Sequence, residues 1–188
     1  MKKVYITSGV GRSGKDTFCE FVGTYIPTHK YSIVDLPKEA ARVLGWTGGK
    51  TEKDRKFLSD IMDLSTEYND SPFQDVLSVV TDFKNNLIED KVLFIDMRDP
   101  KDIARAVETF GAETILIRNP NVAKIESNHA DANVEDYNYD YIIENDGTLG
   151  QLDAMAKLFV REIICWNEVK EHEKPIVLIC SNMMEVKS

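Results

Sequence analysis

Short apolar runs alternate with longer amphipathic stretches along the chain. Five runs rich in β-branched and aromatic residues predict strands: KVYITS (3–8), YSIVD (31–35), KVLFID (91–96), AETILIR (112–118) and YDYIIEN (139–145). Intervening stretches such as 15–26 and 99–111 repeat apolar residues at helical spacing. Strands alternating with helices are typical of a parallel sheet with helices on both faces. We therefore expect an α/β, three-layer fold whose five-stranded parallel sheet is flanked by helices.

The other segments are marked by turn-forming and polar residues. Proline at position 37 and glycine at 45 predict the ends of a short helix. A turn at 46–52 precedes a helical region that runs to about 89 and breaks near 69–72. A turn and a long amphipathic helix follow 145, and PIVLICS (175–181) predicts either an extra edge strand or a packed tail.

These patterns predict one domain over 1–188, with no internal repeat. Its parts are a core over 1–168, a helical insert at about 37–90, a polar flap at about 119–138 and a C-terminal extension at about 169–188. The flap has no clear periodicity, and long loops of this kind in compact domains are often functional.

The first strand leads into a glycine-rich loop of the form G-x-x-x-x-G-K, which precedes a predicted helix. Strand, loop and helix in this order predict a polyphosphate-binding loop, in which backbone amides and the helix N-terminus hold the anion. Glycines allow the backbone to curl, and the lysine reaches the outer phosphates. The expected nucleotide-binding residues are Gly9, Gly11, Arg12, Ser13, Gly14, Lys15, Asp16 and Thr17.

The residue after the lysine departs from the pattern, because Asp16 stands where a serine or threonine hydroxyl usually ligates Mg²⁺. A carboxylate is also a hard oxygen ligand, and one or two carboxylates commonly hold Mg²⁺ together with phosphates and waters. Asp96 ends a buried strand and is the natural second anchor. We expect Asp16 and Asp96 at the metal; the alternative for Asp16 is a purely electrostatic role at the helix N-terminus.

Two arginines follow predicted strands, at the sheet edge where ligands bind in such folds. Arg98 offers a bidentate fork to a phosphate, although it could equally pair with Asp99 or Asp102. Arg118 begins the flap. Together with Lys15 they are the expected catalytic residues, since phosphoryl transfer needs positioning, charge neutralisation and exclusion of water.

The segment after the second predicted strand carries the candidates for binding the acceptor. Asp35 ends that strand, and Lys38 and Arg42 are four residues apart on one helical face. Two cations on one face suit an anionic acceptor, with Arg98 as a further ligand. The alternative is that these are solvated helix charges paired with Glu39 and its neighbours.

Composition narrows the range of functions. The formal net charge is -9, which excludes a generic nucleic-acid binder but permits a small anionic ligand. Three scattered cysteines show no metal-ligand or disulfide spacing. The sequence has no apolar run near the length of a membrane span and no signal peptide, so we expect a cytoplasmic protein without nucleic-acid or membrane partners.

Several segments together resemble one family, the phage-type deoxynucleoside monophosphate kinases of the adenylate-kinase-like group. They are SGVGRSGKDTF, VDLPKEAARVLGW, VLFIDMRDPKDIARAVETFGAETILIRNP and SNHADANVEDYNYDYIIENDGTLGQL, in the family's order. The resemblance implies a P-loop kinase fold, ATP with Mg²⁺ as cofactors, and transfer to a nucleoside monophosphate. It also implies that Asn145 and Gly147 lie beside adenine, Lys38 binds the acceptor and Arg98 holds phosphate.

Three functions remain open at this stage. The first is a nucleoside or deoxynucleoside monophosphate kinase whose only partners are small-molecule nucleotides, as a monomer or homodimer. The second is a kinase for another phosphorylated acceptor such as dephospho-coenzyme A, although such kinases normally show G-S-G-K-S in the loop. The third is a nucleotide-binding switch or regulatory ATPase.

Overall fold

The computed structural model describes residues 2–122, 133–165 and 175–182. Residues 123–132 of the predicted flap, and 169–174 and 183–188 of the predicted extension, lie outside the described residues. The chain divides into two compact units. Residues 1–30 and 90–188 form the sheet unit, and residues 31–89 form the helical unit.

In the part of the chain that the structure describes, the sheet has six strands in the order β2-β3-β1-β4-β5-β6. Their bounds are β1 (Lys3–Ser8), β2 (Thr28–Ser32), β3 (Val92–Asp96), β4 (Glu113–Arg118), β5 (Tyr141–Glu144) and β6 (Ile176–Ile179). The β1–β3, β1–β4, β4–β5 and β5–β6 pairs are all parallel. The predicted α/β class is confirmed, but five strands was wrong: the apolar run IVLI adds a sixth strand beside β5.

The second strand also differs from the prediction of 31–35. Strand β2 runs over Thr28–Ser32 and is half-buried, so its sequence THKYS carries no apolar run. Asp35 begins a helix instead of ending a strand. Its Oδ2 accepts a hydrogen bond from the backbone N–H of Ser32 at 2.9 Å, which holds the turn between strand and helix.

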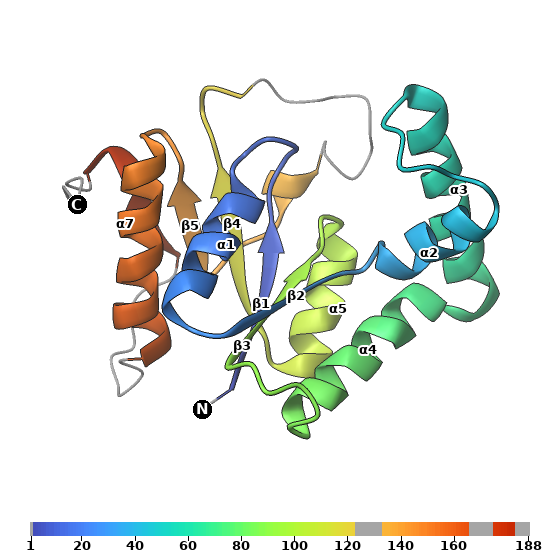
Figure 1. Cartoon of the computed structure of the whole chain (residues 1–188), viewed down its shortest axis with the longest axis horizontal. Coiled ribbons are helices and arrows are strands. Elements are labelled where there is room, and N and C mark those ends of the chain that lie inside the picture. The colour runs from blue at the N-terminus through green and yellow to red at the C-terminus, as the bar shows by residue number, and fades with distance from the viewer. Residues whose placement is uncertain (1, 123–132, 166–174, 183–188) are drawn as a thin grey trace. The chain divides into compact units, whose positions relative to one another are not determined.

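Three helices of the sheet unit lie close to the sheet: α1 (Lys15–Tyr25), α5 (Pro100–Phe110) and α7 (Leu149–Phe159). α1 and α7 lie side by side and share one core with alternate strand residues, as in Tyr5, Phe18, Phe94, Ile115, Tyr141 and Phe159 (Figure 1). The intervening strand residues, such as Ile6 and Leu116, are also buried and point to the opposite face. α5 contacts β1 and β4 and has its own buried residues outside the first core, so helices cover both faces.

Short irregular elements complete the sheet unit. Val134–Asp136 and Cys180–Asn182 form 3₁₀ turns, and the predicted long C-terminal helix changes to a π-helical stretch over Val160–Cys165. α5 has an aspartate N-cap, Asp99, and ends at Gly111, which has a φ of 65°. The helix predicted over 99–111 is confirmed, with the first and last of these residues as its caps.

The helical unit contains α2 (Asp35–Val43), α3 (Glu52–Asn69) and α4 (Ser71–Lys84). Thr51 caps α3 in a reciprocal capping box with Asp54, as the predicted turn at 46–52 suggested. Asp70, with a φ of 57°, separates α3 from α4 at the predicted break. Within the part of the chain that the structure describes, no helix is both long and apolar enough to cross a bilayer.

Parallel pairing brings the ends of the central strands to one edge of the sheet. Thr7 of β1 is opposite Asp96 of β3, and Arg118 of β4 is opposite Glu144 of β5. The glycine-rich loop leaves β1 at this same edge. Ligands of such sheets bind beyond the carboxyl ends of the strands, so this edge is where a site is expected.

Candidate functional site

The glycine-rich loop passes so close to its neighbours that side chains are excluded at two positions. A Cβ on Gly9 would lie 2.4 Å from the carbonyl oxygen of Ile117, and a Cβ on Gly14 would lie 2.3 Å from Asn145 Nδ2. Gly14 also has a left-handed φ of 92°. Gly11 does not adopt a positive φ; the exposed Arg12 does, at 69°. The expectation that all three glycines curl the loop therefore holds for the ends of the loop and not for its middle.

The N-terminus of α1 is open toward the loop. Gly14 is the N-cap and has no side chain to accept hydrogen bonds from the first turn, and the first intrahelical bond joins Phe18 N–H to Gly14 O at 2.9 Å. The amides of the first turn, including those of the predicted Asp16 and the half-buried Thr17, therefore have no intrahelical partner. Such amides and the partial positive charge of the helix terminus suit an anion.

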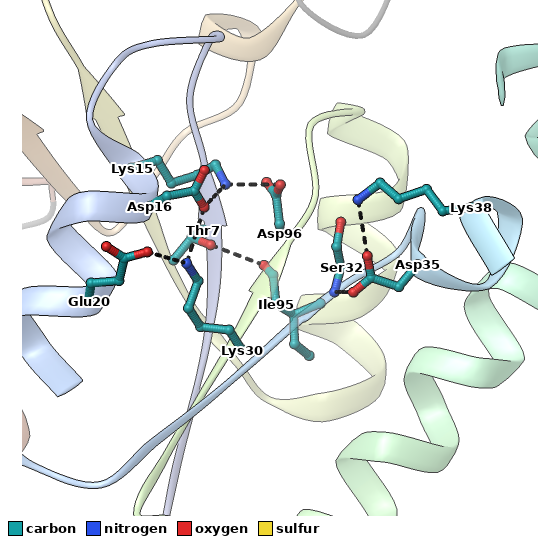
Figure 2. Close-up of polar contacts among 10 residues, drawn as sticks. All are labelled: Thr7, Lys15, Asp16, Glu20, Lys30, Ser32, Asp35, Lys38, Ile95 and Asp96. Carbon is teal, nitrogen blue, oxygen red and sulfur yellow. Dashed lines mark hydrogen bonds and ion pairs between the residues drawn. The ribbon is translucent and has the colours of Figure 1, made fainter. Parts of the chain in front are cut away.

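Lys15 places a buried ammonium group at the centre of the site. Its side chain is 8% exposed, and Nζ lies 2.9 Å from Asp96 Oδ2 and 3.4 Å from Asp16 Oδ1 (Figure 2). Burial lowers the pKa of this ammonium, but the charge and hydrogen bond of Asp96, helped by Asp16, outweigh it and raise the pKa above its ordinary value. Lys15 is therefore charged at neutral pH.

Two of the buried side-chain oxygens that lack a partner in the described residues belong to the glycine-rich loop and to the carboxyl end of β3. Asp96 Oδ1 and Ser13 Oγ have no hydrogen-bond partner among the described residues. Burying a polar atom without a partner costs free energy, so such atoms at a binding edge indicate a missing ligand. The carboxylate oxygen suits Mg²⁺ or one of its waters, and the hydroxyl suits a phosphate oxygen.

The second predicted metal ligand, Asp16, is more exposed. Its side chain is 73% exposed, and the same oxygen, Oδ1, contacts Lys15 and also Lys30 at 3.3 Å. Lys30 in turn lies 3.8 Å from Glu20. Burial raises the pKa of Asp16, but the two lysines outweigh it and hold the pKa below its usual range. Asp16 is thus an ionised carboxylate beside Lys15 and Asp96.

Two carboxylates, Asp16 and Asp96, are the candidate ligands for a cation, and both contact Lys15. In the described residues, no group of three or more histidines, cysteines, aspartates or glutamates could hold a metal. Mg²⁺ typically takes one or two carboxylates and completes its shell with phosphates and water. The donor set fits Mg²⁺ that arrives with a nucleotide, whereas a resident protein-bound metal would need more ligands.

The two predicted arginines differ in their surroundings. Arg118 donates from Nε to Glu144 Oε1 at 2.6 Å, and its Nη2 also contacts that oxygen. The hydrogen bond to Glu144 raises the pKa of Arg118. Arg98 is half-buried and lies just beyond β3, where Met97 N–H continues the ladder by bonding Thr7 O. Arg98 comes two residues after Asp96, the last residue of β3.

The loop between β5 and α7 touches the glycine-rich loop directly. Asn145 Nδ2 donates to Ser13 O at 2.9 Å, and Asn145 N–H donates to Arg118 O at 2.8 Å. A Cβ on Gly147 would lie 2.5 Å from Gln151 Oε1 and 3.3 Å from the carbonyl carbon of Cys180. Asn145 therefore contacts the glycine-rich loop, and Gly147 lies in the same short connection between β5 and α7. Their proposed contact with adenine stays a prediction.

The predicted acceptor residues belong to the helical unit, and each has a local partner there. Lys38 Nζ lies 3.1 Å from Asp35 Oδ1 (Figure 2), and the Arg42 guanidinium lies 5.7 Å from the centroid of the Trp46 ring. Lys38 therefore pairs with Asp35, whereas the alternative reading of the sequence favoured Glu39. The predicted role of these residues in acceptor binding stays a prediction.

Sequence patterns missed four residues of this edge: Lys30, Glu144, Asp146 and Ser181. Each forms a pair with a residue distant in sequence. Asp16 and Lys30 are 14 residues apart, and Asp146 and Ser181 are 35 apart. The sequence could have indicated only the pair of Glu144 with Arg118, because neighbouring parallel strands that end together place their last residues side by side.

Substitution of Gly14 by alanine is expected to lower the affinity for Mg-ATP by at least about tenfold and the stability by about 1–3 kcal/mol. The reasons are the left-handed φ and the clash with Asn145, which would push the loop away from the amide that holds it. Calorimetry and thermal melting measure both effects. Gly45→Ala is a matched control. Gly45 also has a left-handed φ, +95°, but a Cβ added there would have no atom within 4 Å. This variant should therefore lose a similar amount of stability from backbone strain and keep the wild-type affinity for Mg-ATP.

No protein-family model matches the chain, and no curated protein matches it. Among solved structures, TT1252 from Thermus thermophilus aligns over 86% of this chain and 98% of its own, at 14% identity and a TM-score of 0.47. A sugar kinase from Janibacter sp. HTCC2649 aligns over 97% and 88%, at 12% identity and a TM-score of 0.39. An LAO/AO transport system kinase aligns over 95% of this chain but 52% of its own, at 13% identity and a TM-score of 0.36. At these identities and TM-scores the neighbours' activities do not transfer to this chain, whose function follows from its own residues.

Proposed function

We propose that the chain is a kinase that transfers the γ-phosphoryl group of ATP, with Mg²⁺, to a nucleoside or deoxynucleoside monophosphate. The observation that carries the proposal is the buried ammonium of Lys15, held between a glycine-rich loop, an open helix N-terminus and two carboxylates. A buried lysine whose neighbours include unsatisfied oxygen atoms suits a ligand that brings both phosphates and a cation.

The residues of this edge divide between the phosphates and the cation. The amides of Gly9–Thr17, the Ser13 hydroxyl and Lys15 would hold the phosphate oxygens. Asp96 and Asp16 would face Mg²⁺, which supplies charge neutralisation when bound. Lys15 would exchange part of its contact with Asp96 for a phosphate oxygen, which leaves the Asp96 carboxylate available to the metal.

The chemical step asks little covalent help from the protein. Charge spread over the transferring phosphoryl group requires cations that are already in position, because preorganised groups need no reorganisation during the reaction. Lys15 supplies one such charge. Arg98, half-buried and two residues after the end of β3, is the proposed second.

The acceptor is assigned to α2 of the helical unit. Its Lys38 and Arg42 offer cations at helical spacing, and Asp35 fixes the Lys38 ammonium by an ion pair. The resemblance to the monophosphate kinases supports this assignment, and the two cations suit an anionic acceptor even though Asp35 and Glu39 balance them within α2. Base and sugar preference would be set by contacts with the rest of the acceptor.

The test is acceptor-dependent formation of ADP from Mg-ATP. The panel contains nucleoside and deoxynucleoside monophosphates, dephospho-coenzyme A and a reaction without acceptor. ADP formation that requires one monophosphate and yields its diphosphate supports the proposal. Dependence on dephospho-coenzyme A alone would assign a different kinase, and slow hydrolysis indifferent to every acceptor would assign an ATPase or switch.

Substitution of Lys38 by methionine is expected to raise the KM for the acceptor by about 10- to 150-fold, since a charged hydrogen bond contributes about 1.5–3 kcal/mol. The KM for ATP should not change. Lys56→Met is the matched control, because Lys56 also pairs with an aspartate on a helix of the same unit, Asp60, at 2.8 Å. Equal effects of both substitutions would remove Lys38 from the acceptor site.

A further inference from the structure

The C-terminal segment 175–182 packs against the loop that supports the phosphate site. Strand β6 extends the sheet beside β5, with Glu144 opposite Ile179. The 3₁₀ turn Cys180–Asn182 follows, and Cys180 is fully buried in the core of the sheet unit. The C-terminal segment is therefore part of the fold of this unit and ends next to the connection 145–148.

Asp146 holds this turn with both carboxylate oxygens. Oδ1 accepts the backbone N–H of Ser181 at 2.8 Å, and Oδ2 accepts the Ser181 hydroxyl at 2.7 Å. Gln151 of α7 also donates to Ser181 O at 3.4 Å, while its Oε1 accepts Thr148 N–H at 2.9 Å. The connection and the turn are thus joined by several bonds that fix their relative position.

The next residue along the connection holds the phosphate loop. Asn145 precedes Asp146 and donates from Nδ2 to Ser13 O, in the middle of the glycine-rich loop. Gly14 is tightly packed against the same amide. One short connection therefore contacts the phosphate loop through Asn145 and the C-terminal turn through Asp146.

We propose that Asp146 and Ser181 are positioning residues for the phosphate loop. Their paired hydrogen bonds fix the connection 145–148, so that Asn145 holds Ser13 O and the loop amides point toward a polyphosphate. The C-terminal segment thereby sets the affinity of the site for phosphates, although it does not touch them. The inference rests on the phosphate-binding part of the proposed function and is independent of the acceptor.

The test measures binding to two ligands, Mg-ATP and Mg-tripolyphosphate, by calorimetry, with thermal melting in parallel. Asp146→Ala is expected to weaken both ligands equally, by about 3- to 10-fold, since the lost contacts are exposed hydrogen bonds to a carboxylate. Ser181→Ala, which keeps the backbone bond, should give a smaller loss. The double variant should bind no more weakly than Asp146→Ala, because the two side chains act as one unit.

The matched control is Asp153→Ala. Asp153 lies on α7 and accepts a 2.9 Å hydrogen bond from Tyr25, so its removal costs a similar exposed contact away from the phosphate loop. It should lower the melting temperature without changing either affinity. Asp146→Asn, which keeps one acceptor oxygen, should recover part of the lost affinity.

Two results would overturn the inference. One is a fall in the melting temperature of the Asp146 and Ser181 variants with both affinities unchanged. The other is weaker binding of Mg-ATP with tripolyphosphate unaffected, which would place the contact at the nucleoside. A wild-type protein that binds both ligands but transfers no phosphoryl group would refute the kinase and leave this inference standing, whereas a wild type that binds neither refutes both.

Discussion

Replacing Lys15 with methionine is expected to lower phosphoryl transfer by at least about 10³-fold, the size of effect seen when a preorganised positive group is removed from a transition state. Methionine keeps the length and the apolar part of the side chain but removes the positive charge that lies 2.9 Å from Asp96 Oδ2. Turnover and Mg-ATP affinity, measured together, report the loss. Turnover above about a tenth of the wild-type value would contradict the assigned role.

The substitution of Lys15 also affects stability, because it breaks the ion pair with Asp96. The Asp96 carboxylate, which is 24% exposed, then loses this partner. We expect Lys15→Met to cost about 1–3 kcal/mol of stability, less than a fully buried pair would cost. The double variant Lys15→Met/Asp96→Asn should recover most of that stability and none of the turnover. Lys56→Met is the control for loss of a charge elsewhere, since that lysine is 74% exposed and pairs with Asp60 on α3; it should leave turnover unchanged.

The central strands were predictable because both of their faces are buried. β1, β3 and β4 lie in the middle of the sheet, and most of their residues are buried. Such apolar runs lack the spacing of an amphipathic helix. Gly9 after β1 and Asp96 at the end of β3 mark where these strands reach the edge of the sheet. The position of the glycine-rich loop follows directly from them.

The edge strands were harder to predict, because burial on both faces is what makes a strand recognisable and edge strands are less buried. β2 has half-buried and exposed residues, so the buried Ile33 drew the predicted strand three residues too far along the chain. β6 is apolar but isolated by polar sequence, and a short apolar run of this kind is equally consistent with a packed tail. Only pairing with the open edge of β5 decides between them.

The chemistry of the site was predictable residue by residue, but its pairing was not. The lysine, its neighbouring aspartate and the strand-end aspartate were expected at one edge, and the structure brings both aspartates within 3.4 Å of Lys15 Nζ. The partners Lys30 of Asp16 and Ser181 of Asp146 depend on the register of distant segments. A local pattern carries no information on that register.

The interior of the loop shows a further limit of pattern reading. A glycine in a phosphate-loop motif suggests a left-handed position, yet Arg12 and not Gly11 adopts positive φ here. A non-glycine residue in that region costs about 1 kcal/mol and persists only where the surroundings hold it. The bond from Ser13 N–H to Val10 O, at 3.1 Å, closes the turn around Arg12.

Replacing Arg98 with alanine is expected to lower kcat by about 10²- to 10³-fold, which corresponds to about 3–4 kcal/mol of transition-state stabilisation. The loss should appear equally in kcat and in kcat/KM, because the arginine is proposed to neutralise charge that develops only during transfer. The KM for ATP should stay within about twofold, since Lys15 and the loop amides bind the ground state. Steady-state kinetics with the preferred acceptor measure all three quantities.

The arginine's geometry, as well as its charge, is part of this expectation. Arg98→Lys keeps the charge but loses the planar fork that matches two phosphate oxygens, so it should restore little of the turnover. Arg161→Ala is the matched control: Arg161 is 70% exposed and pairs with its neighbour Glu162, and its removal should leave turnover unchanged. If Arg98→Ala instead raises the KM for the acceptor with kcat intact, the guanidinium binds the acceptor phosphate in the ground state and does not stabilise the transition state.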